Sequence, residues 1–310
     1  MCLDIFSLIH YFCMGITANC AKFLLYARTQ GVDFSHTVML GRQQLFLSPI
    51  EKEKLERKIQ AVLPDGNSFA EPFFTGVGAK KIESIDYSDF EGATIKHNMN
   101  DMISPDHFNR YSLLFDGGTL EHIFNFPIAI KNCMNMLKVG GHFVAITPSN
   151  NYSGHGFYQF SPELFFSLFT PAHGFNLKLV AMGVELPSKG ITEWFKVKDP
   201  KRAGARVTII NSFPTSLMVI AEKIRATEEL PLKPFQSDYQ HFWEVHDAIN
   251  NDVQREGEKK WIHHYRRRTP EFIKKLIRRI RGLQDKQGNI DRLGNVNPSF
   301  FTRMDVDDNV

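Results

Sequence analysis

The sequence predicts an α/β fold, a doubly wound and mostly parallel sheet covered by helices. From about residue 36 onward, short runs of β-branched and apolar residues alternate with longer helical patterns, as parallel strands joined by helices do. The length of 310 residues allows one large domain with appendages, or two domains. With 43% apolar and 23% charged residues, the composition is that of an ordinary globular protein and excludes a disordered or fibrous chain.

The first 35 residues are expected to form an N-terminal helical segment packed on the main domain. Apolar residues recur there at helical spacing, at positions 5, 9, 12, 16, 20, 23 and 27. Asp4, His10, Asn19 and Lys22 interrupt the apolar run, and no basic region precedes it. We therefore expect neither a signal peptide nor a membrane span, and a cytoplasmic location.

Seven runs are predicted strands, five of them in the first half of the chain: 36–41, 82–87, 93–98, 111–116 and 141–147. Two later runs, 175–185 and 215–224, have no convincing helix between them and predict an antiparallel hairpin. The insertion between them, 186–213, contains Pro187 and Gly204 among other helix and strand breakers. We expect a mobile surface loop there.

Helical patterns lie between these strands, at 50–63, 69–75, 125–138 and 161–169. The third is expected to end at Gly140-Gly141. The fourth opens with Ser161-Pro162, a good N-cap and first-turn pair. Together these elements assign residues 36–224 to one α/β domain.

The C-terminal part of the chain is helical in pattern and strongly basic. Residues 255–286 hold twelve Lys or Arg against four acids, whereas the whole chain has a formal net charge of only +3. In 270–283 the apolar residues form one stripe, which predicts a basic amphipathic helix. It could contact an anionic surface, attract an acidic substrate, bind a partner, or simply dock on the domain. No specific nucleic-acid binding is expected, because 261–268 mixes aromatic and basic residues without an RNA-binding motif.

Residues 225–288 are accordingly predicted as a basic helical extension and the polar residues 289–310 as a flexible, frayed tail. The four cysteines, at 2, 13, 20 and 133, form no C-x-x-C pair and no zinc-ligand pattern with the twelve histidines. Neither a disulfide scaffold nor a metal site is predicted.

Polar and glycine residues collect after four predicted strands, at 41–43, 86–89, 97–100 and 116–122. In open α/β sheets, ligands bind outside the carboxyl ends of the strands. Asp86 there could accept hydrogen bonds from both hydroxyls of a ribose. Asn98, one strand further on, could offer a donor and an acceptor to an adenine edge. Each alone is more typical of a turn or helix cap, but together, in this order, they favour a nucleoside.

The segment FDGGTLEHIFNFPIAIKNCMNMLKVGGHFVAITPSN, residues 115–150, resembles class I S-adenosylmethionine-dependent methyltransferases. Asp116 matches the family's motif after strand four, 120–122 its Leu-Glu-His turn, and 137–141 its Leu-Lys-x-Gly-Gly hairpin into strand five. The resemblance covers 36–224. It implies a Rossmann-like, seven-stranded sheet that ends in an antiparallel hairpin, S-adenosyl-L-methionine as the cofactor, and methyl transfer as the reaction.

The resemblance also implies positions for the cofactor. It puts Asp86 on the ribose, Tyr87 against the adenine face, Asn98 and Met99 at the adenine edge, and Asp116, Gly117 and Gly118 beside the methionine moiety. The family's G-x-G-x-G turn after strand one is reduced to Gly41, followed by Arg42 and Gln43. Either Arg42 and Gln43 contact the cofactor carboxylate instead, or the site has degenerated. A nicotinamide-dependent dehydrogenase uses a similar sheet, but the missing glycine fingerprint and the hairpin count against it.

The acceptor is expected beside residues 150–160, where such folds place substrate. Methyl transfer to a hydroxyl needs alignment with the methyl group and a general base. His155 is the predicted base, with His122 second and Glu121 or Tyr158 as orienting groups; either histidine could instead bond a backbone carbonyl. The predicted function is O-methylation of a small molecule or sugar. The alternative is an inactive cofactor-binding protein or interaction module with the same fold.

Overall fold

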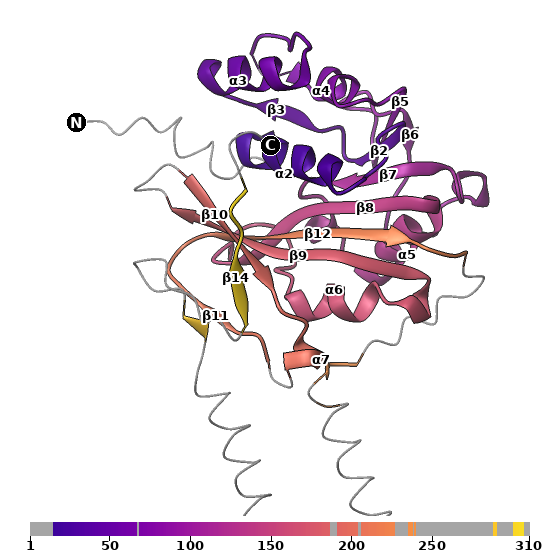
Figure 1. Ribbon diagram of the computed structural model, residues 1–310. Helices are drawn as coiled ribbons and strands as arrows, with labels where there is room; N and C mark the ends of the chain where they lie inside the picture. The colour runs from indigo at the N-terminus through magenta and orange to yellow at the C-terminus, as the bar shows by residue number, and fades with distance from the viewer. Residues whose placement is uncertain are drawn as a thin grey trace, which may run out of the picture.

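A nine-stranded mixed sheet forms the centre of the computed structural model, which describes residues 15–66, 68–186, 191–203, 206–226, 235–237, 239, 288–289 and 300–306 (Figure 1). In spatial order the strands are β14 (Phe301–Arg303), β10 (Ile191–Val197), β9 (Phe175–Leu186), β12 (Thr215–Lys223), β8 (Leu137–Asn150), β7 (Tyr111–Asp116), β2 (His36–Leu40), β5 (Lys81–Asp86) and β6 (Ile95–Lys96).

The sheet has the predicted Rossmann-like, doubly wound order. Strand β2 pairs in parallel with β5 on one side and with β7 on the other, and β6 and β8 continue the parallel part outward. Beyond β8, strand β12 runs antiparallel to both β8 and β9 and forms the terminal hairpin with β9. This is the strand order that the resemblance to class I methyltransferases implies, with a switch point between β2 and β7.

Helices cover both faces of the sheet. On one face lie α2 (Ala18–Thr29), α3 (Pro49–Ile59) and α4 (Glu71–Gly76), and on the other lie α5 (Phe126–Met136) and α6 (Pro162–Leu168) (Figure 1). The side chains of successive β2 residues point to opposite faces of the sheet, as strand pleating requires. Val38 belongs to the hydrophobic core that includes α5, and Met39 belongs to the core that includes α2. All six residues of β7 are buried, as expected of a strand covered on both faces.

Side-chain caps begin α2 and α3, whereas Ser161 occupies the N-cap position of α6 without making a side-chain capping hydrogen bond. Helices α3 and α5 end earlier than expected. Helix α3 opens with a capping box between Ser48 and Glu51 and ends at Gln60, whose backbone is left-handed. Helix α5 ends at Met136, not at Gly140-Gly141, because the chain from Leu137 onward is already strand β8. Gly141 instead allows β8 to pack closely against β7, because a Cβ at this position would lie 2.6 Å from the Tyr111 carbonyl oxygen.

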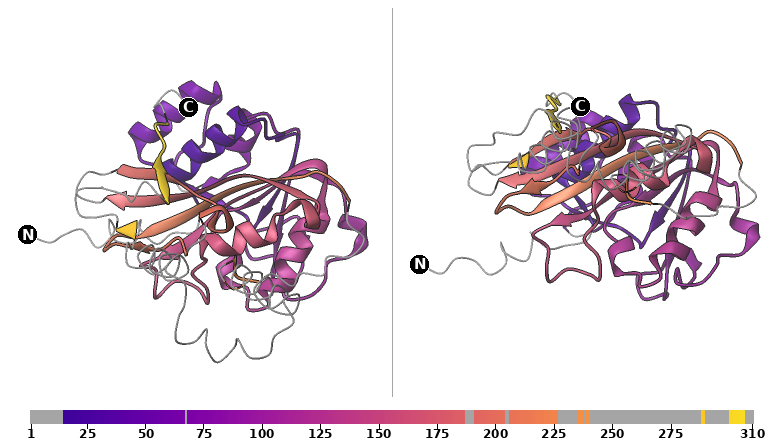
Figure 2. Two further views of the ribbon diagram at one scale, coloured as in Figure 1. Left: turned by 60° about the horizontal axis from the view of Figure 1, so that its bottom comes forward. Right: turned by 90° about the horizontal axis from the view of Figure 1, so that it is seen from below.

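Two expectations about the later part of the chain are wrong. Residues 191–197, within the predicted loop, form β10, which pairs antiparallel with β9. Residues 301–303, within the predicted frayed tail, form β14 on the edge of β10, where Phe301 is 2% exposed (Figures 1 and 2). The sheet therefore has nine strands instead of seven. The short helix α7 (Pro200–Ala203) follows β10.

Of the predicted N-terminal helical segment, residues 1–14 lie outside the described residues, and within 15–35 the helix spans Ala18–Thr29. Ile16–Thr17 form β1, which joins β3 (Gln44–Phe46) and β4 (Ser68–Phe69) in a small second sheet. Thr17 then caps α2 by accepting a hydrogen bond from the Cys20 amide. The buried side of α2 enters the same core as Met39 of β2, so the core continues across the predicted boundary at residue 36.

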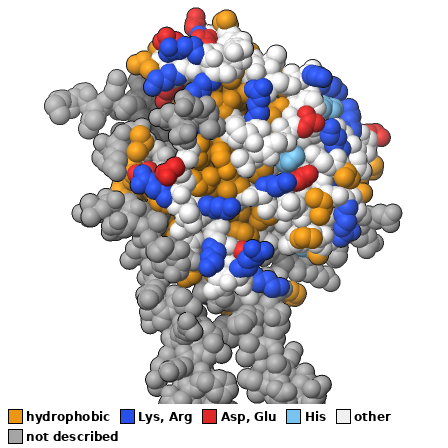
Figure 3. Space-filling model, in the orientation of Figure 1, with side chains coloured by type: hydrophobic (Ala, Val, Ile, Leu, Met, Phe, Trp, Pro, Cys, Tyr) orange, Lys and Arg blue, Asp and Glu red, His pale blue; other side chains and the backbone are white. Residues whose placement is uncertain are grey.

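The basic amphipathic helix expected at 270–283 lies outside the described residues, and so does nearly all of the basic extension. The strands β11 (Ile209–Ile210) and β13 (Gly288–Asn289) pair in parallel as a separate small ladder. On the face drawn in Figure 3, cationic and acidic side chains lie interspersed. Within the described residues, no helix has both the length and the apolar character needed to cross a membrane.

Candidate functional site

The segments that follow β2, β5, β7 and β8 meet at one edge of the sheet. The Gly41 amide donates to the Ile85 carbonyl oxygen at 2.8 Å, which ties the turn after β2 to β5. On the other side, the Thr119 hydroxyl donates to the Leu40 carbonyl oxygen at 2.8 Å, which ties the turn after β7 to β2. The turns after β2 and β7 thus adjoin the switch point, where ligands of such sheets bind.

The turn after β2 is held by its own side chains. Gly41 has a φ of 66°, a left-handed conformation that glycine adopts without strain. The Gln43 amide nitrogen donates to the Leu40 carbonyl oxygen at 2.6 Å, and this buried side chain packs against Gly117 so closely that a Cβ at 117 would lie 2.6 Å from Gln43 Oε1. Gly117 is followed by Gly118, whose φ is 93°. The two glycines let the turns after β2 and β7 approach each other.

Arg42 is engaged by other protein groups. Its Nε donates to Glu71 Oε1 at 2.7 Å and its Nη1 to the Glu91 carbonyl oxygen at 2.7 Å. The guanidinium also stacks 3.8 Å from the ring centroid of Phe69. The predicted contact with a cofactor carboxylate would have to use its remaining donors, and that role stays a prediction.

The residues predicted for the nucleoside lie together at the ends of β5 and β6. Asp86 is half-buried, and its carbonyl oxygen accepts from the His97 amide at 2.8 Å, which sets the turn after β6 beside it. Tyr87 is exposed. The Asn98 side-chain oxygen accepts from the backbone and side chain of Asn100, an internal turn that leaves its amide group as a donor. Met99 points into the core.

Asp116, at the end of β7, is fully buried with one half of its carboxylate unused. Oδ1 accepts from the amides of Thr119 and Leu120, at 2.9 and 3.2 Å, whereas Oδ2 has no hydrogen-bond partner. Burial, and then the charge of Glu121, raise the pKa of Asp116 well above its usual value. A cationic group of a ligand at this edge would relieve that cost.

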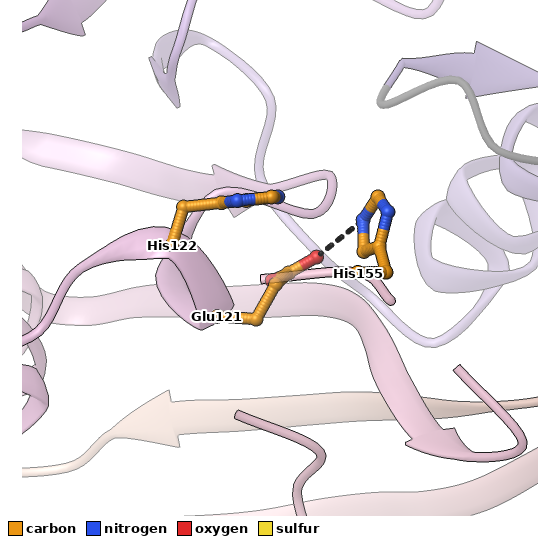
Figure 4. A group of neighbouring side chains, drawn as sticks. All are labelled: Glu121, His122 and His155. Carbon is orange, nitrogen blue, oxygen red and sulfur yellow. Dashed lines mark ion pairs between the residues drawn. The ribbon is translucent and has the colours of Figure 1, made fainter. Parts of the chain in front are cut away.

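Glu121, His122 and His155 form a cluster beside Asp116 (Figure 4). The Glu121 side chain is 1% exposed, and neither carboxylate oxygen makes a hydrogen bond. His155 Nε2 lies 3.4 Å from Glu121 Oε1, and the two imidazole rings stand nearly perpendicular with centroids 4.9 Å apart. His122 is exposed, but partial desolvation of its ring lowers its pKa, and the charge of Glu121 acts in the opposite direction.

The loop after β8 is fixed to this cluster through the Glu121 backbone. The amides of Phe157 and Tyr158 both donate to the Glu121 carbonyl oxygen, at 2.7 and 3.2 Å. Gly156 permits the approach, because a Cβ there would lie 2.8 Å from that oxygen and its φ is 69°. The structure therefore brings His155 together with Glu121 and His122, three of the four predicted catalytic residues.

Tyr158, the fourth, lies in the same loop but bonds elsewhere. Its hydroxyl donates to the Phe124 carbonyl oxygen at 2.6 Å, so it orients the loop and not an imidazole. The sequence reasoning missed Tyr152, whose ring lies 6.1 Å from that of His155 and whose hydroxyl donates to Glu185 Oε1 at 2.6 Å. Nothing in the local sequence signals that Glu185, in β9, reaches this loop.

An exposed aromatic pair adjoins the cluster. Phe124 and Phe157 are 71% and 67% exposed, and their rings meet edge to face with centroids 5.9 Å apart. Each is close in sequence to a histidine of the cluster. Stacked or edge-on aromatic surfaces of this kind suit the apolar face of a sugar or a ring.

No family model matches the sequence, and no curated protein does. Solved structures show partial overlaps. One is 1,6-didemethyltoxoflavin-N1-methyltransferase from Burkholderia thailandensis with bound S-adenosylhomocysteine, at 13% identity and a TM-score of 0.37 over 67% of this chain and 78% of that one. Another is a SAM-dependent methyltransferase from Thermotoga maritima, with 11% identity and a TM-score of 0.40. The match covers 71% of this chain and 93% of that one. A third is the branched-chain polyamine synthase from Thermus thermophilus, with 10% identity and a TM-score of 0.37. The match covers 74% of this chain and 65% of that one.

Proposed function

We propose that this protein is an S-adenosyl-L-methionine-dependent methyltransferase that methylates an oxygen of a small molecule or sugar. The observation that carries the proposal is the pair of carboxylates at the switch point. Asp86 ends β5 and Asp116 ends β7, the two strands that flank β2. A diol would suit the half-buried Asp86, and a cationic group would suit the buried, unpartnered oxygen of Asp116. S-adenosyl-L-methionine carries a ribose diol, an ammonium group and a sulfonium.

The residues at this edge fit that cofactor in their donor and acceptor chemistry. The half-buried Asp86 would accept from the ribose hydroxyls, and the free amide group of Asn98 would donate to the adenine edge. The unpartnered Oδ2 of Asp116 would face a cationic group. When bound, the cofactor supplies an electrophilic methyl group on a sulfonium.

The acceptor would lie between the cofactor edge and the loop after β8. His155 stands beside the buried Glu121 carboxylate, which would stabilise the imidazolium formed when His155 takes a proton from the acceptor hydroxyl. The exposed rings of Phe124 and Phe157 would stack on a sugar or an aromatic acceptor and help to exclude water.

The first test is thermal unfolding with and without S-adenosyl-L-methionine or its demethylated product, for the wild type and for Asp86→Ala. Ligand at about 100 times its dissociation constant should raise the free energy of unfolding by roughly 2.7 kcal/mol. We expect this shift in the wild type and its loss in Asp86→Ala. Asp89→Ala, which removes a neighbouring exposed carboxylate, is the matched control and should keep the shift. No shift in the wild type would refute the proposal.

A catalytically inactive cofactor-binding protein is the second candidate. The engagement of Arg42 by Glu71 and Glu91, and of Gln43 by Leu40, favours it, because these side chains stand where the family's glycine turn would meet the cofactor. The two candidates differ in one readout: an enzyme releases S-adenosylhomocysteine when given a panel of hydroxylated acceptors. The cytoplasmic location and a partner for residues 270–283 remain predictions from the sequence.

A further inference from the structure

Glu121, His122 and His155 present one carboxylate and two imidazoles to a common point. One ligand-type atom from each lies within 4.8 Å of the other two. They come from different parts of the chain, because Glu121 and His122 belong to the 3-10 turn Leu120–His122 after β7 and His155 to the loop after β8. Figure 4 shows the Glu121 carboxylate directed toward His155, with the His122 ring alongside.

The distance between Glu121 and His155 fits two ligands of one ion better than a charged hydrogen bond. A charged N–H···O bond normally spans about 2.7–2.9 Å, whereas Glu121 Oε1 and His155 Nε2 are 3.4 Å apart. Two ligands that are each about 2.1 Å from one ion, at a tetrahedral angle, lie about 3.4 Å from each other. The three ligand atoms lie within 4.8 Å of one another, so His122 reaches the same spacing only by a side-chain movement of up to about 1.4 Å.

Burial and charge also call for a cation. Both oxygens of Glu121 are buried without a hydrogen bond, which is costly for a carboxylate. Asp116, a second buried carboxylate, interacts electrostatically with Glu121. Within the described residues, neither ring nitrogen of His122 has a hydrogen-bond partner. The cluster therefore has free ligand atoms and an excess of negative charge.

We propose that Glu121, His122 and His155 bind one divalent transition-metal ion. Two imidazole nitrogens with one carboxylate suit Zn²⁺, Co²⁺, Mn²⁺ or Fe²⁺, whereas Mg²⁺ and Ca²⁺ prefer oxygen ligands. Three protein ligands leave positions open for water or an acceptor oxygen. The sequence analysis predicted no metal because it searched for ligands at fixed spacing along the chain, and this set is joined only by the fold.

The ion would give the acceptor an anchor, a step that rests on the proposed function. An acceptor hydroxyl on an open coordination position would be held beside the cluster and made more acidic by the ion. His155 would then act as a ligand through Nε2 instead of as the base. Metal binding itself needs neither the cofactor nor an acceptor, so it can be tested even if the proposed function fails.

The experiment is titration of the full chain, without a polyhistidine tag, with Co²⁺ followed in the visible spectrum. We expect a visible band that saturates at one ion per chain, disappears when Zn²⁺ is added, and persists in excess Mg²⁺. Glu121→Gln, His122→Ala and His155→Ala should each weaken Co²⁺ binding at least tenfold, since loss of even an outer-shell partner costs about 10–100-fold.

The control is His107→Gln, which removes a histidine near Tyr111, at the opposite end of β7. It should bind Co²⁺ as the wild type does. The inference is overturned if the wild type gives no saturable band, or if the band survives in both Glu121→Gln and His155→Ala. Far-ultraviolet circular dichroism of each variant separates loss of ligands from loss of fold: a variant with altered spectra is replaced by Glu121→Asp or His155→Asn, for which the same tenfold loss is required.

Discussion

At the scale of single residues, Asp116 combines a structural role with a buried oxygen that has no hydrogen-bond partner. Its Oδ1 fixes the turn after β7 by accepting two backbone amides, while Oδ2 stays buried without a partner next to a second carboxylate. The raised pKa means that keeping this group ionised destabilises the folded chain at neutral pH. Residues at such a cost concentrate in functional sites.

We predict that Asp116→Asn separates these two roles. The side-chain oxygen of asparagine can still accept from the Thr119 and Leu120 amides, while the buried charge disappears. The free energy of unfolding without ligand should stay the same or rise by roughly 1 kcal/mol, and the affinity for S-adenosyl-L-methionine should fall at least tenfold. Urea unfolding and isothermal titration calorimetry measure the two quantities. A destabilised variant with unchanged affinity would show that Asp116 is only structural.

At the scale of elements, the end of α5 depends on a lysine far away in the sequence. Lys223, the last residue of β12, is buried and donates from Nζ to the carbonyl oxygens of Met134 and Leu137, at 3.0 and 2.7 Å, and to Asn109 Oδ1 at 3.0 Å. It thereby satisfies acceptors that a helix C-terminus leaves open. The sequence predicted the helix from its periodicity but placed its end at the nearest glycines, because the true cap is 86 residues from Leu137.

Lys223→Met should leave the buried carbonyl oxygens of Met134 and Leu137 without this donor and lower the free energy of unfolding by about 2–3 kcal/mol. The effect should depend on pH. Burial lowers the pKa of Lys223 to about 8, below the value of about 10.4 in an unfolded chain. Between these values the unfolded state binds a proton that the folded state has released, so this lysine's contribution to stability rises with pH.

Urea unfolding of the wild type and Lys223→Met at pH 7 to 10 measures both effects. The stability difference between the two proteins should grow as the pH rises from 8 toward 10. Lys178→Met, which removes a partly exposed lysine paired with Glu222 on the same sheet, is the control and should cost less than 1 kcal/mol. Equal losses in the two variants would contradict the capping role.

At the scale of the whole molecule, the sequence predicted the parallel strands and the hairpin but not the strands that extend it. The runs at 111–116 and 141–147 are apolar because they are buried on both faces, so their composition alone reveals them. Strand β14 has three residues, of which only Phe301 is buried, and it pairs with the edge of β10, which no local pattern in 301–303 indicates. Likewise, single residues such as Asp86 and Asp116 could be predicted from strand ends, whereas the meeting of His155 with Glu121 depends on the path of a loop.

This edge should behave as a separate cooperative unit. Phe301 is buried in the core with Phe195 of β10, the Lys198 amide donates to the Phe300 carbonyl oxygen, and Arg303 pairs with Glu193 at 3.2 Å.

Phe301→Ala removes the apolar side chain that holds β14 on the sheet and should lower the local free energy of unfolding by about 3 kcal/mol. Amide hydrogen exchange should accelerate in 191–197 while β7 and β8 keep their protection, since edge and centre open with different free energies. Thr302→Ala, on the exposed side of β14, should leave exchange unchanged. Uniform acceleration across the sheet would instead mean that β14 stabilises the whole fold, and that the segment returning from the basic extension is integral to the domain.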